Sequence, residues 1–227
     1  MVMDWQTKRE FKDQIYDQFA RICKALGNGR RLELLDILAQ GECSVEKLAR
    51  ETGMSMANVS QHLQVLRSAH LVGIRRDGQY IYYRLADEEV YRVWQDIRRL
   101  AETKLAEIDR IVSAYLGHRQ ELEPVGLTEL QRRLEEGGLF VIDVRPTEEY
   151  MAGHIPSARS IPLEELKERL TEIPEDQEVV AYCRGPYCVF SDEAVSLLRA
   201  HGRKAYRLEL GFPEWRAMGL PVKSAED

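Results

Sequence analysis

The chain has 227 residues, of which 44% are hydrophobic and 31% charged, and its net charge is −6 at pH 7. This length suits two small domains, and the composition is that of a soluble globular protein. No run of about 18 apolar residues is present to span a membrane. Residues 1–12 lack an apolar signal-peptide core, and 4 cysteines without a framework spacing argue against a secreted disulfide scaffold. We therefore expect a cytoplasmic protein.

The negative charge is unevenly distributed along the chain. Residues 1–120 contain 19 Lys and Arg against 17 Asp and Glu, whereas residues 121–227 contain 13 against 21. An acidic protein is a poor candidate for binding nucleic acid. Because the acidity lies in the second half, the first half remains a candidate.

Four helices are predicted at the start of the chain. Apolar residues at helical spacing indicate helices over residues 5–26 and 30–39, each followed by a glycine-containing stop. Ser44 and Ser55 occupy N-cap positions for two further helices, over 45–52 and 56–69, with Gly53 between them. Two short helices joined by a tight turn with glycine make a helix-turn-helix candidate.

A β-hairpin is expected next. Residues 71–74 and 80–85 have strand patterns on either side of a basic turn, Arg-Arg-Asp-Gly-Gln, in which Asp-Gly is a strong hairpin signal. A helix-turn-helix followed by a basic hairpin is a winged helix. Over residues 18–116 the chain resembles the ArsR/SmtB family of bacterial repressors, on the strength of residues 60–63 (SQHL), Leu66, the turn at 75–78 and residues 83–85 (YRL).

The fourth helix is the predicted DNA-recognition helix. One face of this helix contains Met56, Val59, Leu63 and Leu66. The opposite arc contains the polar residues Asn58, Gln61 and Gln64 together with Ala57 and Val65. That arc would enter a major groove, with Asn or Gln facing adenine edges and Ala57 or Val65 facing a thymine methyl group. Arginines would contact phosphates or the minor groove. The alternatives are an ordinary solvated helix face and a solvated hairpin turn. The predicted contacts to double-stranded operator DNA are Ser55, Ala57, Asn58, Ser60, Gln61, His62, Gln64, Arg67, Arg75, Arg76 and Arg84.

Residues 87–117 are predicted to form one long helix, whose apolar stripe is broader than a small domain needs. In ArsR-like proteins the equivalent helix pairs with that of a second subunit. The resemblance therefore implies a homodimer through residues 87–117, which suits palindromic operators. Residues of about 117–124 are interpreted as a linker, which divides the chain into domains at 1–118 and 119–227.

Metal sensing is common among ArsR relatives, but the ligand patterns of that family are missing. One site places two cysteines two positions apart, and Cys43 has Val45 there. Another needs Asp and His two positions apart, but Asp109 has Ile111 there, and only His118 follows. We expect no metal and no cofactor. Persulfide sensors of the family use cysteines in the second helix and the dimer helix, and none lies between residues 44 and 182.

In the second half of the chain, strands and helices alternate. Strands are expected over 139–144, 179–182 and 205–208, and helices over 127–136, 163–170, 192–201 and 213–218. Such alternation predicts a parallel sheet covered on both faces. The expected fold is therefore a mainly α winged helix-turn-helix with a β-hairpin wing, followed by an α/β domain. Cys183 would lie at the carboxyl end of a strand, where open α/β sheets place their sites.

The loop that begins at Cys183 has the residues of a nucleophilic site. Its N–H groups converge near a helix N-terminus, a setting that stabilises a thiolate, the nucleophilic form of cysteine. The alternative is a buried structural cysteine. With residues 141–145 (VIDVR), 149–158 and 208–222, the loop resembles the rhodanese homology domain over residues 124–222. That resemblance implies a persulfide on Cys183.

The remaining loop residues modify this expectation. Arg184 either binds an anionic substrate or pairs with a nearby carboxylate, and Gly185, Pro186 and Tyr187 complete the active-site loop. Pro186 has no N–H to donate, and Cys188 stands where many relatives have a basic or hydroxyl residue, which disfavours thiosulfate. Phosphoryl chemistry would need an arginine at Val189 and is disfavoured.

Cys188 has two interpretations. It either resolves the Cys183 persulfide to a disulfide or trisulfide, or is a small apolar residue at a helix start. Cys23 and Cys43 are interpreted as structural or adventitious.

Three functions are compatible with these patterns. The leading hypothesis is a dimeric transcriptional repressor whose DNA affinity responds to sulfur on Cys183, taken from a sulfane-sulfur donor and passed to a thiol acceptor. The second is a metabolic rhodanese-type sulfurtransferase in which the winged-helix half serves dimerisation or regulation. The third is a DNA-binding protein with a catalytically idle rhodanese fold.

Overall fold

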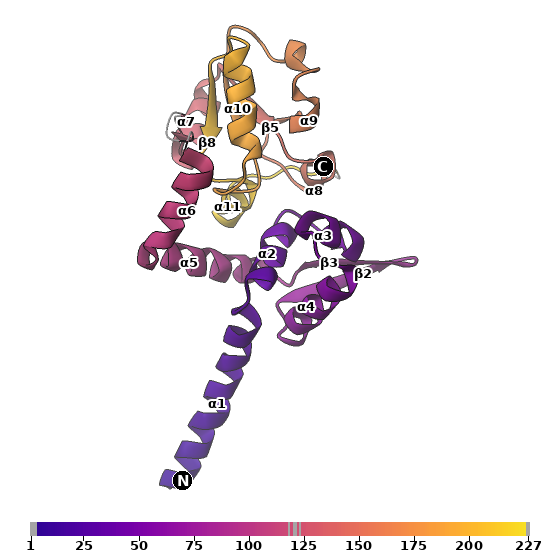
Figure 1. Ribbon diagram of the computed structural model, residues 1–227, viewed down its shortest axis with the longest axis vertical. Helices are drawn as coiled ribbons and strands as arrows, with labels where there is room; N and C mark the ends of the chain where they lie inside the picture. The colour runs from indigo at the N-terminus through magenta and orange to yellow at the C-terminus, as the bar shows by residue number, and fades with distance from the viewer. Residues whose placement is uncertain (1–3, 118, 120–121, 123, 226–227) are drawn as a thin grey trace. The chain divides into compact units, whose positions relative to one another are not determined.

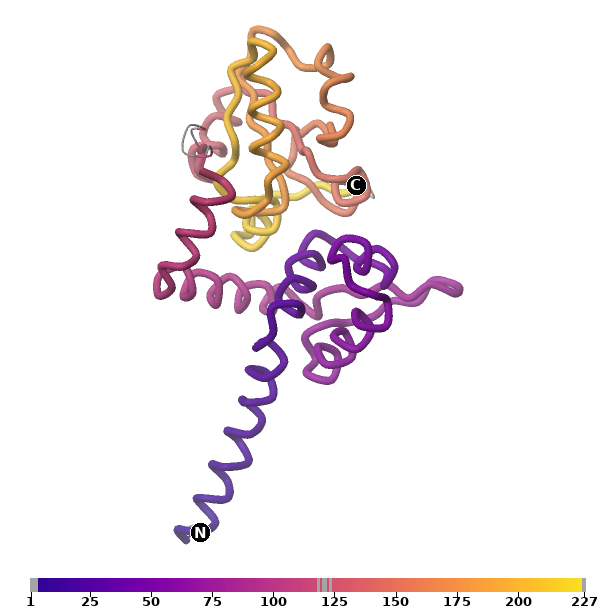
Figure 2. The backbone as a smooth tube through the Cα atoms, viewed as in Figure 1, coloured from indigo at the N-terminus to yellow at the C-terminus, as the bar shows by residue number. Residues whose placement is uncertain are grey.

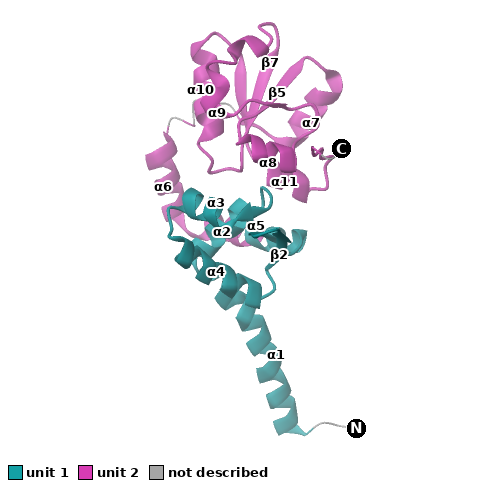
Figure 3. Cartoon of the chain, turned by 90° about the vertical axis from the view of Figure 1, so that its right-hand side faces the viewer, with its two compact units in different colours: residues 1–94 teal, residues 95–227 magenta. Residues whose placement is uncertain are grey.

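The computed structural model describes residues 4–117, 119, 122 and 124–225, and the chain divides into two compact units, residues 1–94 and 95–227 (Figure 3). The division falls within helix α5 (Glu88–Lys104), upstream of the segment interpreted as a linker. Four residues of that segment, His118, Gln120, Glu121 and Glu123, lie outside the described residues. No helix in the described part of the chain is long and apolar enough to cross a membrane.

The four helices at the start of the chain are α1 (Trp5–Leu26), α2 (Gly29–Leu38), α3 (Val45–Thr52) and α4 (Met56–Ser68) (Figure 1). Of these, α3 and α4 begin directly after the predicted caps Ser44 and Ser55, and α1 and α2 lie within one residue of their expected spans. Ser44 Oγ accepts a hydrogen bond from Lys47 N at 3.2 Å, and Ser55 Oγ accepts one from Asn58 N at 3.3 Å. Gly53 takes φ +66° between α3 and α4, a left-handed conformation that favours glycine. The predicted helix-turn-helix is confirmed.

The hairpin is confirmed, with longer arms than expected. Strands β2 (Val72–Asp77) and β3 (Tyr80–Leu85) pair antiparallel with Asp77 opposite Tyr80, and β1 (Cys43–Ser44) pairs with the other edge of β3. Arg75 and Arg76 therefore lie in β2 rather than in a turn. The two-residue loop that remains has Gly78 at φ +59°, the geometry that closes a tight hairpin.

The recognition helix packs on the core through one face. Val59, Leu63 and Leu66 of α4 are fully buried beside residues of α2 and α3. Met56, which the periodicity places on the same face, is the first residue of α4 and is 49% exposed.

The expectation of one helix over 87–117 is wrong. Helix α5 ends at Lys104, Leu105 is extended at φ −117° and ψ 92°, and α6 (Ala106–Leu116) follows in a new direction (Figure 2). Neither glycine nor proline marks the break, and the apolar spacing continues through it. Sequence periodicity therefore cannot detect a change of backbone conformation at a single residue. Such a break depends on tertiary contacts.

Unit 2 is built on a parallel sheet, as predicted. Its strands are β4 (Pro124–Val125), β5 (Leu139–Asp143), β6 (Arg159–Ser160), β7 (Glu178–Tyr182) and β8 (Ala205–Leu208). Their order is β4-β8-β7-β5-β6, and every neighbouring pair is parallel. The two-residue strands β4 and β6 were not predicted, because two residues show no periodicity.

Helices cover both faces of this sheet (Figures 1 and 3). One face has α9 (Leu163–Leu166) and α10 (Phe190–Ala200), and the other has α7 (Leu127–Glu136), α8 (Thr147–Ala152) and α11 (Phe212–Ala217). The helix expected over 163–170 is shorter: it stops at Leu166, and a 3₁₀ turn (Leu170–Glu172) follows. The six-residue α8 is too short for the helical period to reveal.

The alternation of β7 decides which face the loop cysteine joins. Val179, Ala181 and Cys183 belong to the apolar cluster under α10, whereas Val180 and Tyr182 belong to the cluster with Phe212 of α11. Cys183 therefore continues the α10 side of the sheet.

A buried ion pair joins the ends of the central strands to α11. Asp143 and Arg145 are both 0% exposed and linked by hydrogen bonds of 2.6–3.1 Å, and Arg145 Nη2 also donates to Gly153 O at 2.7 Å. The guanidinium carbon lies 4.4 Å from the Phe212 ring centroid. Burial disfavours the charge of Arg145, but the attraction of Asp143 outweighs it, and the pKa of Arg145 is raised.

The Arg145→Ala variant would leave the Asp143 carboxylate buried without its partner. We expect the free energy of unfolding to fall by about 3–5 kcal/mol, measured by denaturant unfolding followed by circular dichroism. The control is Arg132→Ala, which removes an exposed arginine beside Glu129 and Glu136 and should leave the unfolding midpoint unchanged. Equal midpoints for both variants would contradict the structural importance of the buried pair.

Candidate functional site

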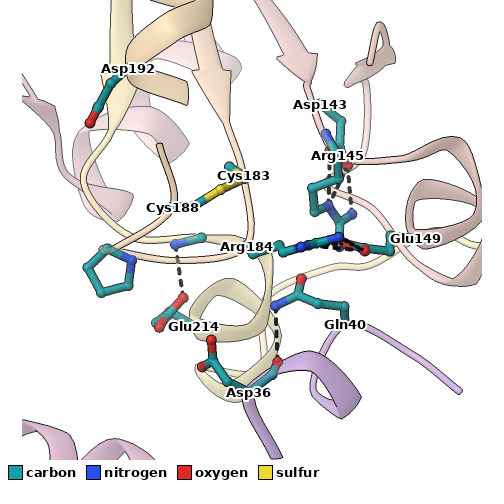
Figure 4. The surroundings of a disulfide bond; sticks show 12 residues. Asp36, Gln40, Asp143, Arg145, Glu149, Cys183, Arg184, Cys188, Asp192 and Glu214 are labelled. Carbon is teal, nitrogen blue, oxygen red and sulfur yellow. Dashed lines mark hydrogen bonds and ion pairs between the residues drawn. A yellow bond between two sulfur atoms is a disulfide. The ribbon is translucent and has the colours of Figure 1, made fainter. Parts of the chain in front are cut away.

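The candidate site is the loop between β7 and α10. Cys183 follows the last residue of β7, is 2% exposed, and forms a disulfide with Cys188 across Cα atoms 6.3 Å apart (Figure 4). Cys188 N donates to Gly185 O at 3.1 Å, which closes the turn between them. The cysteines predicted as nucleophile and resolving residue are thus in bonding contact, before the N-terminus of α10.

The N-terminus of α11 packs against the backbone of the loop. Phe212 N donates to Cys183 O at 3.1 Å, and a Cβ atom on Gly211 would lie 2.4 Å from Gly185 N and 2.5 Å from the Arg184 carbonyl carbon. Real Cβ atoms do not approach backbone atoms so closely, so this position requires glycine. The sequence interpretation included Gly211 in the rhodanese-like segment but did not single it out.

Arg184 points from the loop to α8. Its Nη2 lies 2.6 Å and its Nε 3.1 Å from Glu149 Oε1, and Glu149 is 3% exposed (Figure 4). Of the two alternatives for Arg184, the structure shows the pairing with a carboxylate. This ion pair holds the backbone of the loop beside α8, and an anion-binding role for Arg184 stays a prediction.

A second arginine, which the sequence interpretation missed, contacts the other side of the loop. Arg119 donates through Nη1 to Pro186 O, through Nη2 to Cys188 O at 2.9 Å, and through Nε to Asp192 Oδ2 at 2.6 Å. Asp192 is buried in the first turn of α10. No motif marks Arg119, because its role depends on a contact 67 or more residues away along the chain.

The C-terminal half of α5 also touches the loop region. The Tyr187 hydroxyl donates to Glu102, and Arg98 Nη2 lies 2.8 Å from Glu214 Oε1 in α11. Burial, together with the hydrogen bond to Glu102, raises the pKa of Tyr187 well above its ordinary value. The hydroxyl is therefore protonated at neutral pH and remains a donor.

The candidate DNA-binding residues of α4 form an exposed arc. Ala57, Asn58, Gln61, Gln64 and Arg67 are exposed, as are Ser55, which caps the helix, and Val65, whereas Ser60 and His62 are half-buried. This arc is opposite the buried face, as the helical projection predicts.

The hairpin arginines differ in their surroundings. Arg75 lies 2.6 Å from Glu42 and 4.7 Å from the centroid of the Tyr82 ring, and Arg84 is 3.9 Å from the same Glu42. Arg76 is exposed on the outer part of β2. Glu42 thus offsets part of the positive charge of Arg75 and Arg84, and Asp77 also lies 3.3 Å from Arg75. Arg76 lies one residue nearer the tip of the hairpin.

The described residues contain no group of three or more His, Cys, Asp and Glu placed to hold a metal ion. His118, the one histidine considered as a ligand, lies outside them. Cys23 is an exposed thiol and Cys43 a buried one.

A winged helix-turn-helix unit followed by a parallel α/β unit with a cysteine loop is typical of one class of protein, the winged-helix regulator fused to a second, rhodanese-like domain. Residues 28–73 match the bacterial regulatory protein, arsR family, and residues 126–218 match the rhodanese-like domain. The chain is 47% identical over 211 residues to HTH-type transcriptional regulator Rv0324 of Mycobacterium tuberculosis, covering 93% of this chain and 92% of that protein. It belongs to the ArsR family of transcriptional regulators, in a form fused to a rhodanese domain.

Each half also has relatives of its own. A sulfurtransferase of Allochromatium vinosum is 31% identical over 96 residues, which cover 42% of this chain and 89% of that protein. A structure described as the homodimeric winged helix-turn-helix DNA-binding domain (fragment 1–100) of a Mycobacterium bovis protein is 44% identical. It covers 46% of this chain and 94% of that one, with a TM-score of 0.42.

The Gly211→Ala variant tests the close contact between the start of α11 and the loop backbone. The added Cβ would overlap the loop backbone, so we expect a loss of stability of about 1–3 kcal/mol and faster alkylation of Cys183 in the reduced protein, measured by mass spectrometry. Gly126→Ala is the control, because its Cβ would meet its nearest atom at an ordinary 3.8 Å. Identical alkylation rates for the two variants would show that Gly211 does not constrain the loop.

Proposed function

We propose that this ArsR-family regulator is a repressor whose affinity for operator DNA responds to sulfane sulfur delivered to Cys183. The observation that supports the proposal most directly is the bond between Cys183 and Cys188 in the loop at the end of β7. The two other cysteines of the chain, Cys23 and Cys43, are separate thiols in unit 1. The sulfur chemistry is therefore assigned to the rhodanese-like unit.

The chemistry needs a persulfide as the sulfur donor. The Cys183 thiolate attacks the terminal sulfur of a persulfide R–S–SH, which becomes Cys183–S–SH while the thiolate R–S⁻ leaves with the remaining electron pair. The Cys188 thiolate then attacks Cys183 Sγ, forming the disulfide and expelling hydrosulfide, HS⁻. Sulfane sulfur is the oxidant in this sequence, so no further electron acceptor is required. The closed loop is the product.

The surroundings of the pair favour this attack. Cys188 lies two residues before α10, whose positive N-terminal end stabilises a thiolate. Cys183 is buried in the apolar cluster under α10, which limits its access to bulky reagents. Since Arg184 is directed to Glu149, a compact persulfide suits the loop better than the thiosulfate dianion.

We further propose that the protein acts as a homodimer. Helix α1 exposes Phe11, Phe19 and Ile22 at 58%, 59% and 37%, and α6 exposes Ile111 and Tyr115 at 58% and 81%. Such apolar surface on long helices is typical of an interface, and a two-fold dimer suits a palindromic operator. Sedimentation equilibrium should give twice the mass of the chain, and a monomer at micromolar concentration would contradict the dimer.

Operator binding with and without a polysulfide donor tests the sulfur response. When polysulfide is added, the affinity of the wild-type protein for the operator should fall by about tenfold, which corresponds to a coupling free energy within the typical range of about 1–3 kcal/mol. The affinity of Cys183→Ser should not change. Cys23→Ser is the matched control, since it removes an exposed thiol outside the loop and should respond as the wild type does. Equal responses from wild type and Cys183→Ser would remove the proposed sensor.

The DNA surface is tested by Arg76→Ala. An arginine on the wing that contacts a phosphate or the minor groove should weaken binding to all sequences similarly and reduce the slope of log affinity against log salt by about one. The control is Arg9→Ala, which removes an exposed arginine of α1 that pairs with Asp13. An unchanged salt slope for Arg76→Ala would exclude that contact.

A second candidate function, metabolic sulfur transfer, is favoured by the 31% identity to a protein named as a sulfurtransferase. In this case the Cys183 persulfide would pass its sulfur to an external thiol in repeated turnovers. Steady-state turnover with a persulfide donor and a thiol acceptor tests it. Turnover no faster than that of Cys183→Ser would exclude it.

A further inference from the structure

The loop that contains Cys183 and Cys188 is bound by the side chain of Arg119. Arg119 follows α6 by three residues, and its side chain is 11% exposed. Its side chain donates hydrogen bonds to the carbonyls of Pro186 and Cys188 and to the carboxylate of Asp192. The Pro186 and Cys188 carbonyls belong to the loop itself. Whether both lie within reach of the Arg119 guanidinium therefore depends on the conformation of the loop.

The third acceptor anchors Arg119 to the body of the domain. The Asp192 side chain is 1% exposed, and its other oxygen lies 3.7 Å from Arg207 Nε. Neither Asp192 Oδ1 nor Arg207 Nε has a hydrogen-bond partner among the described residues. Burial and the nearby Arg119 charge lower the pKa of Arg207. Two arginines thus share one carboxylate, and Arg119 needs the loop carbonyls to complete its hydrogen bonds.

The other end of this contact is α6, which has no buried residue of its own. A helix with few buried apolar contacts has low local stability, so contacts next to it in the chain contribute more to holding it. Arg119, three residues beyond Leu116, makes such contacts with Cys188 and Asp192. The loop also has a second tie to the same region, since Tyr187 donates to Glu102 near the C-terminus of α5.

We propose that Arg119 is a positioning residue that couples the sulfur state of the Cys183–Cys188 loop to the α5–α6 segment. In the disulfide state the Pro186 and Cys188 carbonyls converge on its guanidinium and hold the end of α6 against α10. When the bond opens, the two carbonyls separate and Arg119 keeps Asp192 alone. This inference rests on the proposed function, for which it supplies the link between sulfur chemistry and α6, one of the two helices proposed to form the dimer interface.

The coupling is reciprocal. If the closed loop favours the Arg119 contacts, those contacts favour the closed loop by the same factor. Opening consumes two thiols, so that the disulfide and two R–SH give two cysteine thiols and R–S–S–R. The equilibrium constant of this exchange with glutathione therefore reports the Arg119 contacts without any DNA present.

Arg119→Lys is the informative variant. An ammonium group keeps the charge beside Asp192, so the fold is retained, but it lacks the planar fork that spans a carboxylate and two carbonyls. In the full-length protein, the equilibrium constant for reduction of the disulfide by glutathione should rise by about tenfold. This is the change expected when one hydrogen bond to a charged group is lost. Tyr187→Phe should shift this equilibrium in the same direction by about threefold, because the bond to Glu102 that it removes is exposed to solvent and therefore contributes less.

The matched control is Arg203→Ala. Arg203 has the same 11% side-chain exposure and binds a carbonyl and a carboxylate, those of Leu170 and Glu175, away from the loop. It should leave the glutathione equilibrium at the wild-type value. In operator binding, Arg119→Lys should bring the affinity ratio with and without polysulfide close to one, and it should have no effect in the Cys183→Ser background. A merely structural role would change affinity in both backgrounds.

The two readouts separate this inference from the proposed function. If wild-type operator binding ignores polysulfide while Arg119→Lys still shifts the glutathione equilibrium, the sensor function fails and the loop contact stands. If Arg119→Lys behaves as Arg203→Ala does in the glutathione equilibrium, the inference is overturned. A wild-type protein in which Cys183 and Cys188 form no disulfide would overturn both.

Discussion

The ion pair between Asp143 and Arg145 is the constraint on which the arrangement around Cys183 depends. An arginine buried to 0% exposure is tolerable only when its donors are satisfied, and here a carboxylate and the Gly153 carbonyl satisfy them. The same guanidinium lies against Phe212, so α11 is held where the sheet ends. Phe212 N donates to Cys183 O, and Gly211 lies against the loop backbone. The position of the loop therefore depends, through α11, on the Asp143–Arg145 ion pair.

The loop itself is held by charged side chains on several sides rather than by apolar packing alone. Glu149 binds Arg184, Arg119 binds the carbonyls near Cys188, and Glu102 binds Tyr187. Each contact comes from a different part of unit 2, so a change of covalent state in the loop, as the proposed function requires, would act on several of them together. The proposed sensor needs two states of this loop, whereas rapid turnover would need the loop to keep one geometry through the cycle.

The ArsR half contributes a surface of a different kind. Its core is closed by buried leucines and valines, and the arc of α4 opposite that core is polar and exposed. The wing adds arginines, two of which lie beside Glu42. The net charge of −6 therefore does not oppose DNA binding, because the acidic excess belongs to the second half of the chain and the wing retains its arginines.

By itself the sequence determined the winged helix-turn-helix, the parallel sheet, and the place of Cys183 in the loop that follows a central strand. Capping residues, hydrophobic period and the Asp-Gly turn are local signals, and Ser44, Ser55 and Gly78 act where they stand. The break at Leu105, the pairing of Arg184 with Glu149 and the contacts of Arg119 were decided only by the tertiary structure. Each depends on residues far apart in the chain, whose approach no local pattern records.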